Sequence, residues 1–180
     1  MNNAFLKAVF MTIIGLSLVA ILAGCQTTTQ VDKIVAKQQI NQFLNKWHRA
    51  AATANANDYF GGLNKDSIFI GTDATENWRK DAFYEWGKGY FEKGEAWDFT
   101  AIDRNIYFSD GGQLAWFDEL LETTNLGICR GSGVLKMTQA GWKIEHYVLS
   151  VTSPNETVNK VTELNKPFEA SIKAKFKNKK

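Results

Sequence analysis

Apolar and polar residues alternate along the chain from about Trp97 to Thr152, and short turns interrupt the alternation. A period of two is the pattern of a strand whose two faces differ. Glycines in Asp110-Gly111-Gly112 and Gln139-Ala140-Gly141 supply the positive φ angles that tight hairpins need. We therefore expect four antiparallel strands, over 97–109, 113–122, 127–137 and 142–152.

Before this segment the apolar residues recur at helical spacing instead. Ile40, Phe43, Leu44, Trp47 and Ala51 predict an amphipathic helix over 32–53. A short helical turn over 57–63 and a strand over 67–71 follow. A second helix is expected over 79–93, with Thr75 or Asn77 as its cap and Gly94 at its end. Helices first and a meander later predict an α+β domain, with the helices covering one face of a curved sheet.

The first 24 residues have the pattern of an export signal. Lys7 precedes an apolar run from Ala8 to Gly24, and Leu22-Ala23-Gly24-Cys25 resembles the bacterial lipobox. That resemblance implies cleavage before Cys25, lipidation of its sulfur with acyl chains such as palmitate, and anchoring in the cell envelope. Because Gln26 is not the Asp that often retains lipoproteins in the inner membrane, we expect anchoring in the outer membrane, facing the periplasm, if the cell has two membranes. The alternatives are a retained membrane anchor and an ordinary secretory signal.

Removing 24 of the 180 residues leaves 156, enough for one domain with a real core. From Lys166 the chain has six Lys and one Glu, which favours a solvated, partly frayed tail, with contact to anionic lipid or wall polymers as the alternative. The rest of the body is mildly acidic, which argues against a nucleic-acid partner. Cys129 is left without a disulfide partner and is expected to be a small buried residue. The expected division of the chain is 1–24 signal peptide, 25–31 tether, 32–155 domain and 156–180 tail.

Several segments in order resemble the SnoaL-like branch of the NTF2-like superfamily. They are WHRAAATANANDYFGGLNKDSIFIGTDATENW, FDELL, GICRGSGVLK and WKIEHYVLS, within Ile40 to Asn155. The resemblance implies a cone-shaped domain in which about three helices pack on a strongly curved antiparallel sheet and leave a pocket between them. Many members pair sheet to sheet, so the resemblance also implies a homodimer.

Alternation sorts the strand residues into two faces. Leu114, Trp116, Asp118 and Leu120 are expected to share one face, opposite Ala115, Phe117, Glu119 and Leu121. On the last strand the same rule groups Trp142, Ile144, His146 and Val148 against Lys143, Glu145, Tyr147 and Leu149. Neither face is cleanly apolar, so both are expected to be covered in part.

A half-buried carboxylate in an aromatic cavity has a raised pKa and suits proton transfer. Asp118, beside Trp116 and near Arg130, fits this description, with His146 or His48 as its partner. Related enzymes use one Asp or an Asp–His pair, but no such set is reproduced here residue by residue, so no reaction is carried over. The structural alternative is a buried ion pair between Asp118 or Glu119 and Arg104 or Arg130. The expected pocket residues are Trp47, His48, Tyr59, Trp97, Trp116 and Arg130.

No metal cluster is visible, because a metal needs three or four convergent ligands, and no phosphate loop is present, so we expect no cofactor. The leading hypothesis is a lipid-anchored envelope domain that binds a small, partly apolar ligand in its cone. One alternative is an isomerase-like or cyclase-like proton-transfer enzyme using Asp118 with a His. The other is a dimeric structural or interaction module. Whether the chain is an enzyme stays open.

Overall fold

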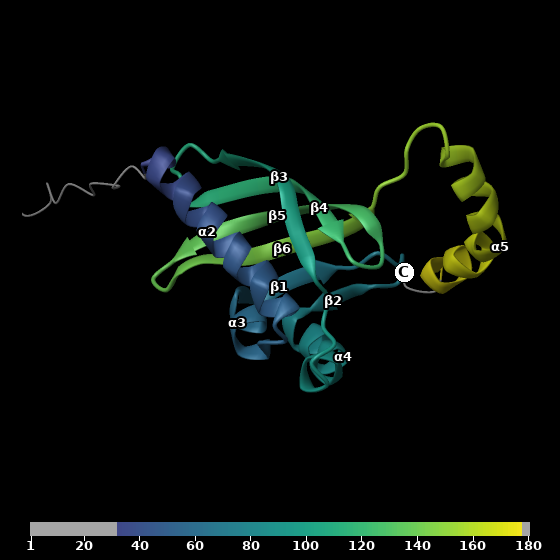
Figure 1. The fold of residues 1–180 in the computed structure, drawn as a ribbon, viewed down its shortest axis with the longest axis horizontal. Coiled ribbons are helices and arrows are strands. Elements are labelled where there is room, and N and C mark those ends of the chain that lie inside the picture. The colour runs from purple at the N-terminus through teal and green to yellow at the C-terminus, as the bar shows by residue number, and fades with distance from the viewer. Residues whose placement is uncertain (1–31, 178–180) are drawn as a thin grey trace, which may run out of the picture. The chain divides into compact units, whose positions relative to one another are not determined.

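The computed structural model describes residues 32–177, so the expected signal peptide, Cys25 and the tether lie outside the described residues. Three helices and six strands form the domain, and a fourth helix follows them (Figure 1). The elements are α2 (Lys33–Ala52), α3 (Ala56–Gly61), β1 (Leu63–Ile70), β2 (Asn77–Arg79), α4 (Lys80–Glu92), β3 (Phe99–Phe108), β4 (Leu114–Thr123), β5 (Gly127–Thr138), β6 (Gly141–Val151) and α5 (Val158–Lys177).

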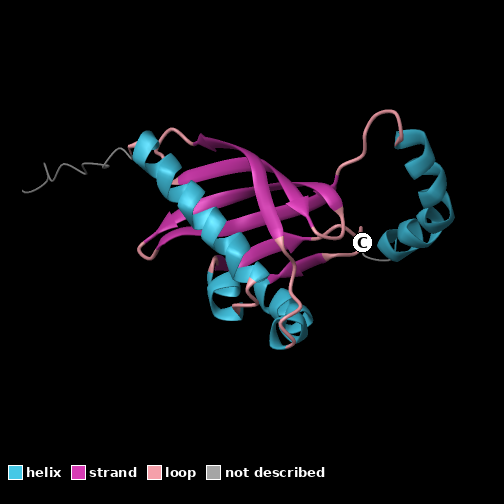
Figure 2. Cartoon of the chain, in the orientation of Figure 1, coloured by secondary structure: helices cyan, strands magenta, loops and turns pink. Residues whose placement is uncertain are grey.

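All six strands belong to one sheet in the order β2-β1-β6-β5-β4-β3. The strands β3 to β6 form the expected antiparallel meander, and β1 joins β6 in parallel. Figure 2 shows the sheet bent beneath the helices, so the expected α+β class with helices on a curved sheet is confirmed. β1 follows α3 and runs in the same direction as β6, so the sheet has one parallel pair.

Helix α2 runs obliquely across one face of the sheet (Figure 1) and contacts β3 and β6. Its N-cap is Asp32, whose carboxylate accepts hydrogen bonds from the backbone amides of Ile34 and Val35. A side chain that accepts such bonds satisfies amides that have no partner within the helix. One side of the helix is buried, and its members are Ala36, Ile40, Leu44, Trp47, His48, Ala50 and Ala51.

The start of α4 differs from the sequence prediction. The side chain of Asp73 holds Thr75 in a turn, and Asn77 pairs with Ile70 as part of β2. Neither residue is therefore available as a cap, and α4 begins after Arg79 without a side-chain cap bond. Strand β1 also begins four residues earlier than expected, at Leu63.

The faces of β6 differ from the sequence prediction because this strand contains a bulge. Ile144 pairs with Leu135 and His146 with Val134, so Glu145 is an extra residue on its strand. An inserted residue exchanges the faces of everything that follows it. Trp142 and Ile144 consequently share the buried face with Tyr147 and Leu149, while His146 and Val148 lie on the opposite face.

The Lys-rich segment, expected to be a partly frayed tail, forms the helix α5. None of its described residues is buried. No helix within residues 32–177 combines the length and the apolar character needed to cross a bilayer.

Candidate functional site

Aromatic rings fill the space between α2 and the middle of the sheet. Trp47 stacks on Tyr59 with ring centroids 4.8 Å apart, and its edge meets Tyr147 at 4.9 Å. The indole nitrogen of Trp47 donates a hydrogen bond to the Tyr59 carbonyl at 2.9 Å. Tyr59 and Tyr147 are each 1% exposed. Two of the expected pocket residues, Trp47 and Tyr59, therefore belong to the core, and Trp47 also lines the hollow described below.

Three ionisable side chains meet inside this core. Glu119 Oε1 lies 2.8 Å from Nε2 of His48, and Glu119 Oε2 accepts a 2.7 Å hydrogen bond from Nε of Arg104. Nη2 of Arg104 also lies 2.7 Å from Oε2, a contact of opposite charges rather than a directed hydrogen bond. Asn41 and Asn45 on α2 accept hydrogen bonds from Nη1 of the same guanidinium. The cluster is the ion pair named as the structural alternative, with Glu119 and Arg104 as its members.

The pKa of Glu119 reflects a balance between burial and its two partners. Burial acts to raise it, but the hydrogen bond and charge of His48, followed by the charge and hydrogen bond of Arg104, outweigh burial and hold this pKa below its ordinary value of 4.5. A carboxylate held ionised by a guanidinium and an imidazole is a structural anchor. It lacks the raised pKa that suits a general acid or base at neutral pH.

The hydroxyl of Tyr147 is also buried and has no hydrogen-bond partner among the described residues. Burial, together with the negative charge of Glu119, raises the pKa of this phenol well above its ordinary value. Gly131 makes room for both groups, because a Cβ atom there would lie 2.5 Å from the Tyr147 oxygen and 2.9 Å from Oε1 of Glu119.

Asp118 and His146 lie on the opposite face of the sheet, away from the helices. Asp118 accepts a 3.3 Å hydrogen bond from the amide of Asn105 and is opposite Ser132 of β5. His146 is opposite Val134, so β5 runs between the two residues expected to act together. The structure does not bring Asp118 into contact with His48 either, because His48 faces the core.

Trp116 and Arg130, two more of the expected pocket residues, share this outer face. Trp116 is 46% exposed and stacks on Tyr107 with ring centroids 6.1 Å apart. Arg130 is exposed and pairs across the strands with Leu120. Both side chains are exposed to solvent, and neither lines the hollows described below, so they form an open surface rather than a pocket wall.

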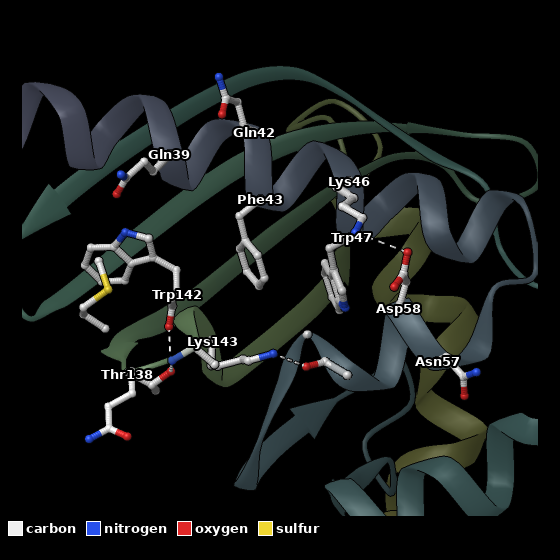
Figure 3. Close-up of a pocket in the computed structure, with 16 residues that line it drawn as sticks. Gln39, Gln42, Phe43, Lys46, Trp47, Asn57, Asp58, Thr138, Trp142 and Lys143 are labelled. Atoms are coloured by element: carbon white, nitrogen blue, oxygen red, sulfur yellow. Dashed lines mark hydrogen bonds and ion pairs between the residues drawn. The ribbon is translucent and has the colours of Figure 1, made fainter.

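A hollow of about 720 Å³ lies on the helical side of the sheet, between α2, α3 and the β5–β6 hairpin. We call it the hairpin groove. In Figure 3, Phe43 and Trp47 point from α2 toward the groove, Trp142 of β6 lies beside them, and Lys143 runs along the lower border. Its lining residues are Gln39, Gln42, Phe43, Lys46, Trp47, Asn57, Asp58, Gly61, Gly62 and residues 137–143.

The charged groups at the hairpin groove are paired with one another or with the backbone. Lys46 Nζ lies 3.3 Å from a carboxylate oxygen of Asp58, and Lys143 Nζ donates a 2.5 Å hydrogen bond to the carbonyl of Gly61. What remains is a mixture of aromatic rings and side-chain amides. Trp142 has a buried indole N–H without a partner among the described residues, a donor left unused. Such a lining suits an uncharged molecule with both apolar and hydrogen-bonding groups.

A second hollow, of about 190 Å³, lies between α4, β1 and the β4–β5 hairpin. It contains Trp97, the remaining expected pocket residue, with Trp78 and Trp86, whose rings stack at 4.8 Å. The aromatic rings here pack largely on one another. Ligand pockets typically measure roughly 300–1,000 Å³, so the hairpin groove matches that size and the second hollow does not.

Sequence reasoning missed most of the hairpin groove. Gln39 and Gln42 are polar residues of an amphipathic helix, and Gln139 belongs to a hairpin turn. Residues of these kinds usually face solvent, so nothing in their spacing predicts that a helix and a distant hairpin will enclose a space. Within the described residues no group of three or more His, Cys, Asp or Glu side chains is arranged to hold a metal ion.

The chain is similar in sequence to one protein family and in fold to several solved structures. The SnoaL-like domain family matches residues 40–154. No curated protein matches the chain in sequence. Among solved structures, an NTF2-like protein of unknown function from Pseudomonas putida is 15% identical with a TM-score of 0.55, covering 69% of this chain and 92% of that one.

Two further structures agree with this fold. A domain of unknown function with a cystatin-like fold from Nostoc punctiforme is 13% identical with a TM-score of 0.57, covering 79% of this chain and 97% of that one. An NTF2-like protein from Cytophaga hutchinsonii is 16% identical with a TM-score of 0.54, covering 64% and 98%. The family match spans most of the domain, and the solved structures share its helices and curved sheet. The chain belongs to the SnoaL-like domain family, and its fold is similar to that of NTF2-like proteins.

Proposed function

We propose that the protein is a lipid-anchored envelope domain that binds a small, partly apolar ligand in the hairpin groove. The observation that carries the proposal is the groove itself. Its volume of about 720 Å³ suits a small molecule, and its wall combines aromatic rings with side-chain amides. Rings such as Phe43 and Trp142 supply apolar contact area, and Gln39 and Gln139 supply donors and acceptors that orient a ligand.

The anchor proposed for this domain is Cys25, because Leu22-Ala23-Gly24-Cys25 resembles a lipobox. A tether from Cys25 to Val31 has seven residues and spans at most about 25 Å when extended. The groove would then work close to the membrane surface. Because Gln26 follows the lipidated cysteine, the membrane proposed is the outer membrane, with the domain facing the periplasm. An apolar ligand released from that membrane reaches such a site over a short path.

Ligand binding has better structural support than proton transfer. Asp118 lies on the outer face, and the buried carboxylate Glu119 has its two oxygens engaged by His48 and Arg104. Neither the hairpin groove nor the second hollow is lined by any of these four residues. A catalytic carboxylate must reach the atom it protonates or deprotonates.

The test compares two tryptophan substitutions in hairpin turns. Ala140→Trp places an indole in the groove, while Gln113→Trp adds the same bulk to the β3–β4 turn. Each variant and the parent are purified from their own envelope and examined by native mass spectrometry. The proposal expects a retained small molecule on the parent and on Gln113→Trp, and its loss from Ala140→Trp. A ligand that survives Ala140→Trp, or its absence from the parent, contradicts the proposal.

A second candidate function, as a dimeric interaction module, is favoured by the outer face of the sheet. Tyr107, Leu114 and Trp116 adjoin one another on this face, and each is more than 40% exposed. Contiguous exposed apolar side chains on a soluble domain are a common mark of an interface. A second copy of this chain, packed face to face, is the partner that we propose for it.

A further inference from the structure

Helix α5 has an apolar stripe from Val161 to Ile172. Val161, Leu164, Phe168 and Ile172 follow one another at spacings of three, four and four residues, which places them on one side of a helix. The spacing is that of a helix which buries one face against something. A helix that is only a solvated spacer does not need this pattern.

The stripe is nevertheless open in the folded domain. Leu164 is 72% exposed and Phe168 is 62% exposed, and no described residue of α5 is buried. Removing such large, exposed apolar side chains from water lowers the free energy, so their burial is favourable. The helix thus presents a formed binding face.

The rest of α5 is basic. Residues 158–177 contain five Lys and two Glu, a net charge of +3, and Lys179 and Lys180 follow. At about 100° per residue, Lys166, Lys173 and Lys177 project from the side opposite the stripe, while Lys175 falls in line with it. A long lysine stem beside an apolar face can lie along it and still hold its charge in water.

An apolar stripe on a basic helix matches a surface that is apolar inside and negatively charged outside. We propose that α5 lies in the surface of a bilayer that contains anionic lipid, with the stripe among the acyl chains and the lysines at the headgroups. A second copy of α5 fits the stripe less well, because pairing would bring two strongly basic helices together. An acidic protein would satisfy the lysines, and the test below separates it from lipid.

The inference goes beyond ligand binding and does not depend on Cys25. If Cys25 is acylated, α5 supplies a second attachment at the other end of the domain, and two weak membrane signals together hold a protein far more firmly than one. The domain would then be held at two points, which restricts the direction that it faces.

The test uses residues 26–180, which have no acyl anchor. Every member of the described core lies between Ala36 and Leu149, so this chain keeps all of those contacts. Binding is measured by co-sedimentation with vesicles of equal parts phosphatidylglycerol and phosphatidylcholine, and with vesicles of phosphatidylcholine alone. We expect binding to the anionic vesicles, weakened at high salt, and at least tenfold weaker binding to phosphatidylcholine.

A matched pair of variants separates the stripe from the charge. Leu164→Asp with Phe168→Asp adds two negative charges on the apolar face, and Asn159→Asp with Thr162→Asp adds the same two charges elsewhere on α5. We expect the first pair to bind at least tenfold more weakly than the second. Replacing Lys166, Lys173 and Lys177 by Gln should weaken binding about 100-fold, since each lysine near an anionic surface contributes roughly a factor of five.

Three results would overturn the proposal. One is failure of residues 26–180 to bind anionic vesicles, which would leave a protein partner for the stripe. Another is equal binding by the two aspartate pairs, which would reduce the contact to charge alone. The third is equal binding to both kinds of vesicle. Circular dichroism of each variant checks that the domain is still folded.

Discussion

Nε2 of His48 lies 2.8 Å from Oε1 of Glu119, and the side chains of both residues are almost wholly removed from water. The contact joins α2 to the middle of β4 across 71 residues of sequence. Arg104 on β3 reaches the other oxygen of the same carboxylate. One buried charge therefore fixes the position of the long helix over two strands.

Removing this charge should destabilise the domain strongly. Glu119→Gln leaves Arg104 buried without its counter-ion, and breaking a buried pair in this way typically costs about 3 to 5 kcal/mol. Urea denaturation measures the change. The neighbouring Asp118→Asn, which lies on the outer face, is the control and should alter the free energy of unfolding by less than about 0.5 kcal/mol. Equal effects of the two substitutions would contradict the assignment.

The same carboxylate should make stability depend on acid pH. Its pKa in the folded protein lies below the ordinary value of 4.5, so the folded state prefers the ionised form. This contribution is complete above about pH 4.5 and is lost as the pH falls through the lower folded value. The free energy of unfolding, measured from neutral pH to about pH 3, should fall more steeply for the parent than for Glu119→Gln. Parallel curves would contradict this prediction.

Gly131 should not tolerate a side chain. A Cβ atom at this position would lie 2.5 Å from the Tyr147 hydroxyl and 2.9 Å from Oε1 of Glu119. Gly131→Ala should therefore cost about 1 to 3 kcal/mol, the usual range for overfilling a packed core. Gly111→Ala is the matched control, because nothing lies within 4 Å of a Cβ atom at Gly111. Thermal unfolding of the two variants distinguishes the positions. A Gly131→Ala variant with the same melting temperature as the parent would contradict tight packing around Gly131.

The outer face should control self-association. Trp116→Lys removes half of the stacked pair with Tyr107 and places a charge in the proposed interface, so a dimer formed there should dissociate to monomers. Sedimentation velocity measures the change, and Lys65→Glu on the exposed part of β1 serves as a charge-changing control. A dimer that persists in Trp116→Lys, or a parent that is monomeric at high concentration, would rule out this interface.

Alternation along the chain was sufficient to place β3 to β6 and to put Glu119 and Asp118 on opposite faces. It was not sufficient for β6, where the extra residue Glu145 exchanges the faces and moves Tyr147 into the core. A bulge has no consistent signature in one sequence, because it depends on pairing with the neighbouring strand. The bulge brings His146 to the same outer face as Asp118, but β5 lies between them, so their expected partnership was not found in the structure.

The polar cluster was anticipated only as an alternative. The sequence offers two carboxylates and two arginines at neighbouring strand positions, and choosing Glu119 with Arg104 requires the register of β3 against β4. His48 joins them because α2 crosses the sheet at that point, which is a tertiary relationship. The hairpin groove depends on the same crossing, since Phe43 and Trp142 are brought together by no local pattern.

The groove's role is tested most directly at the six Trp indoles, which give separate N–H signals in a nitrogen-labelled sample. An organic extract of the cell's own envelope is added to residues 26–180, and each signal is assigned by single Trp→Phe substitutions. The account predicts that the Trp142 signal in the groove shifts with the added extract while the Trp116 signal on the outer face does not. An unmoved Trp142 signal, or a shift confined to Trp116, would contradict a ligand site in the hairpin groove.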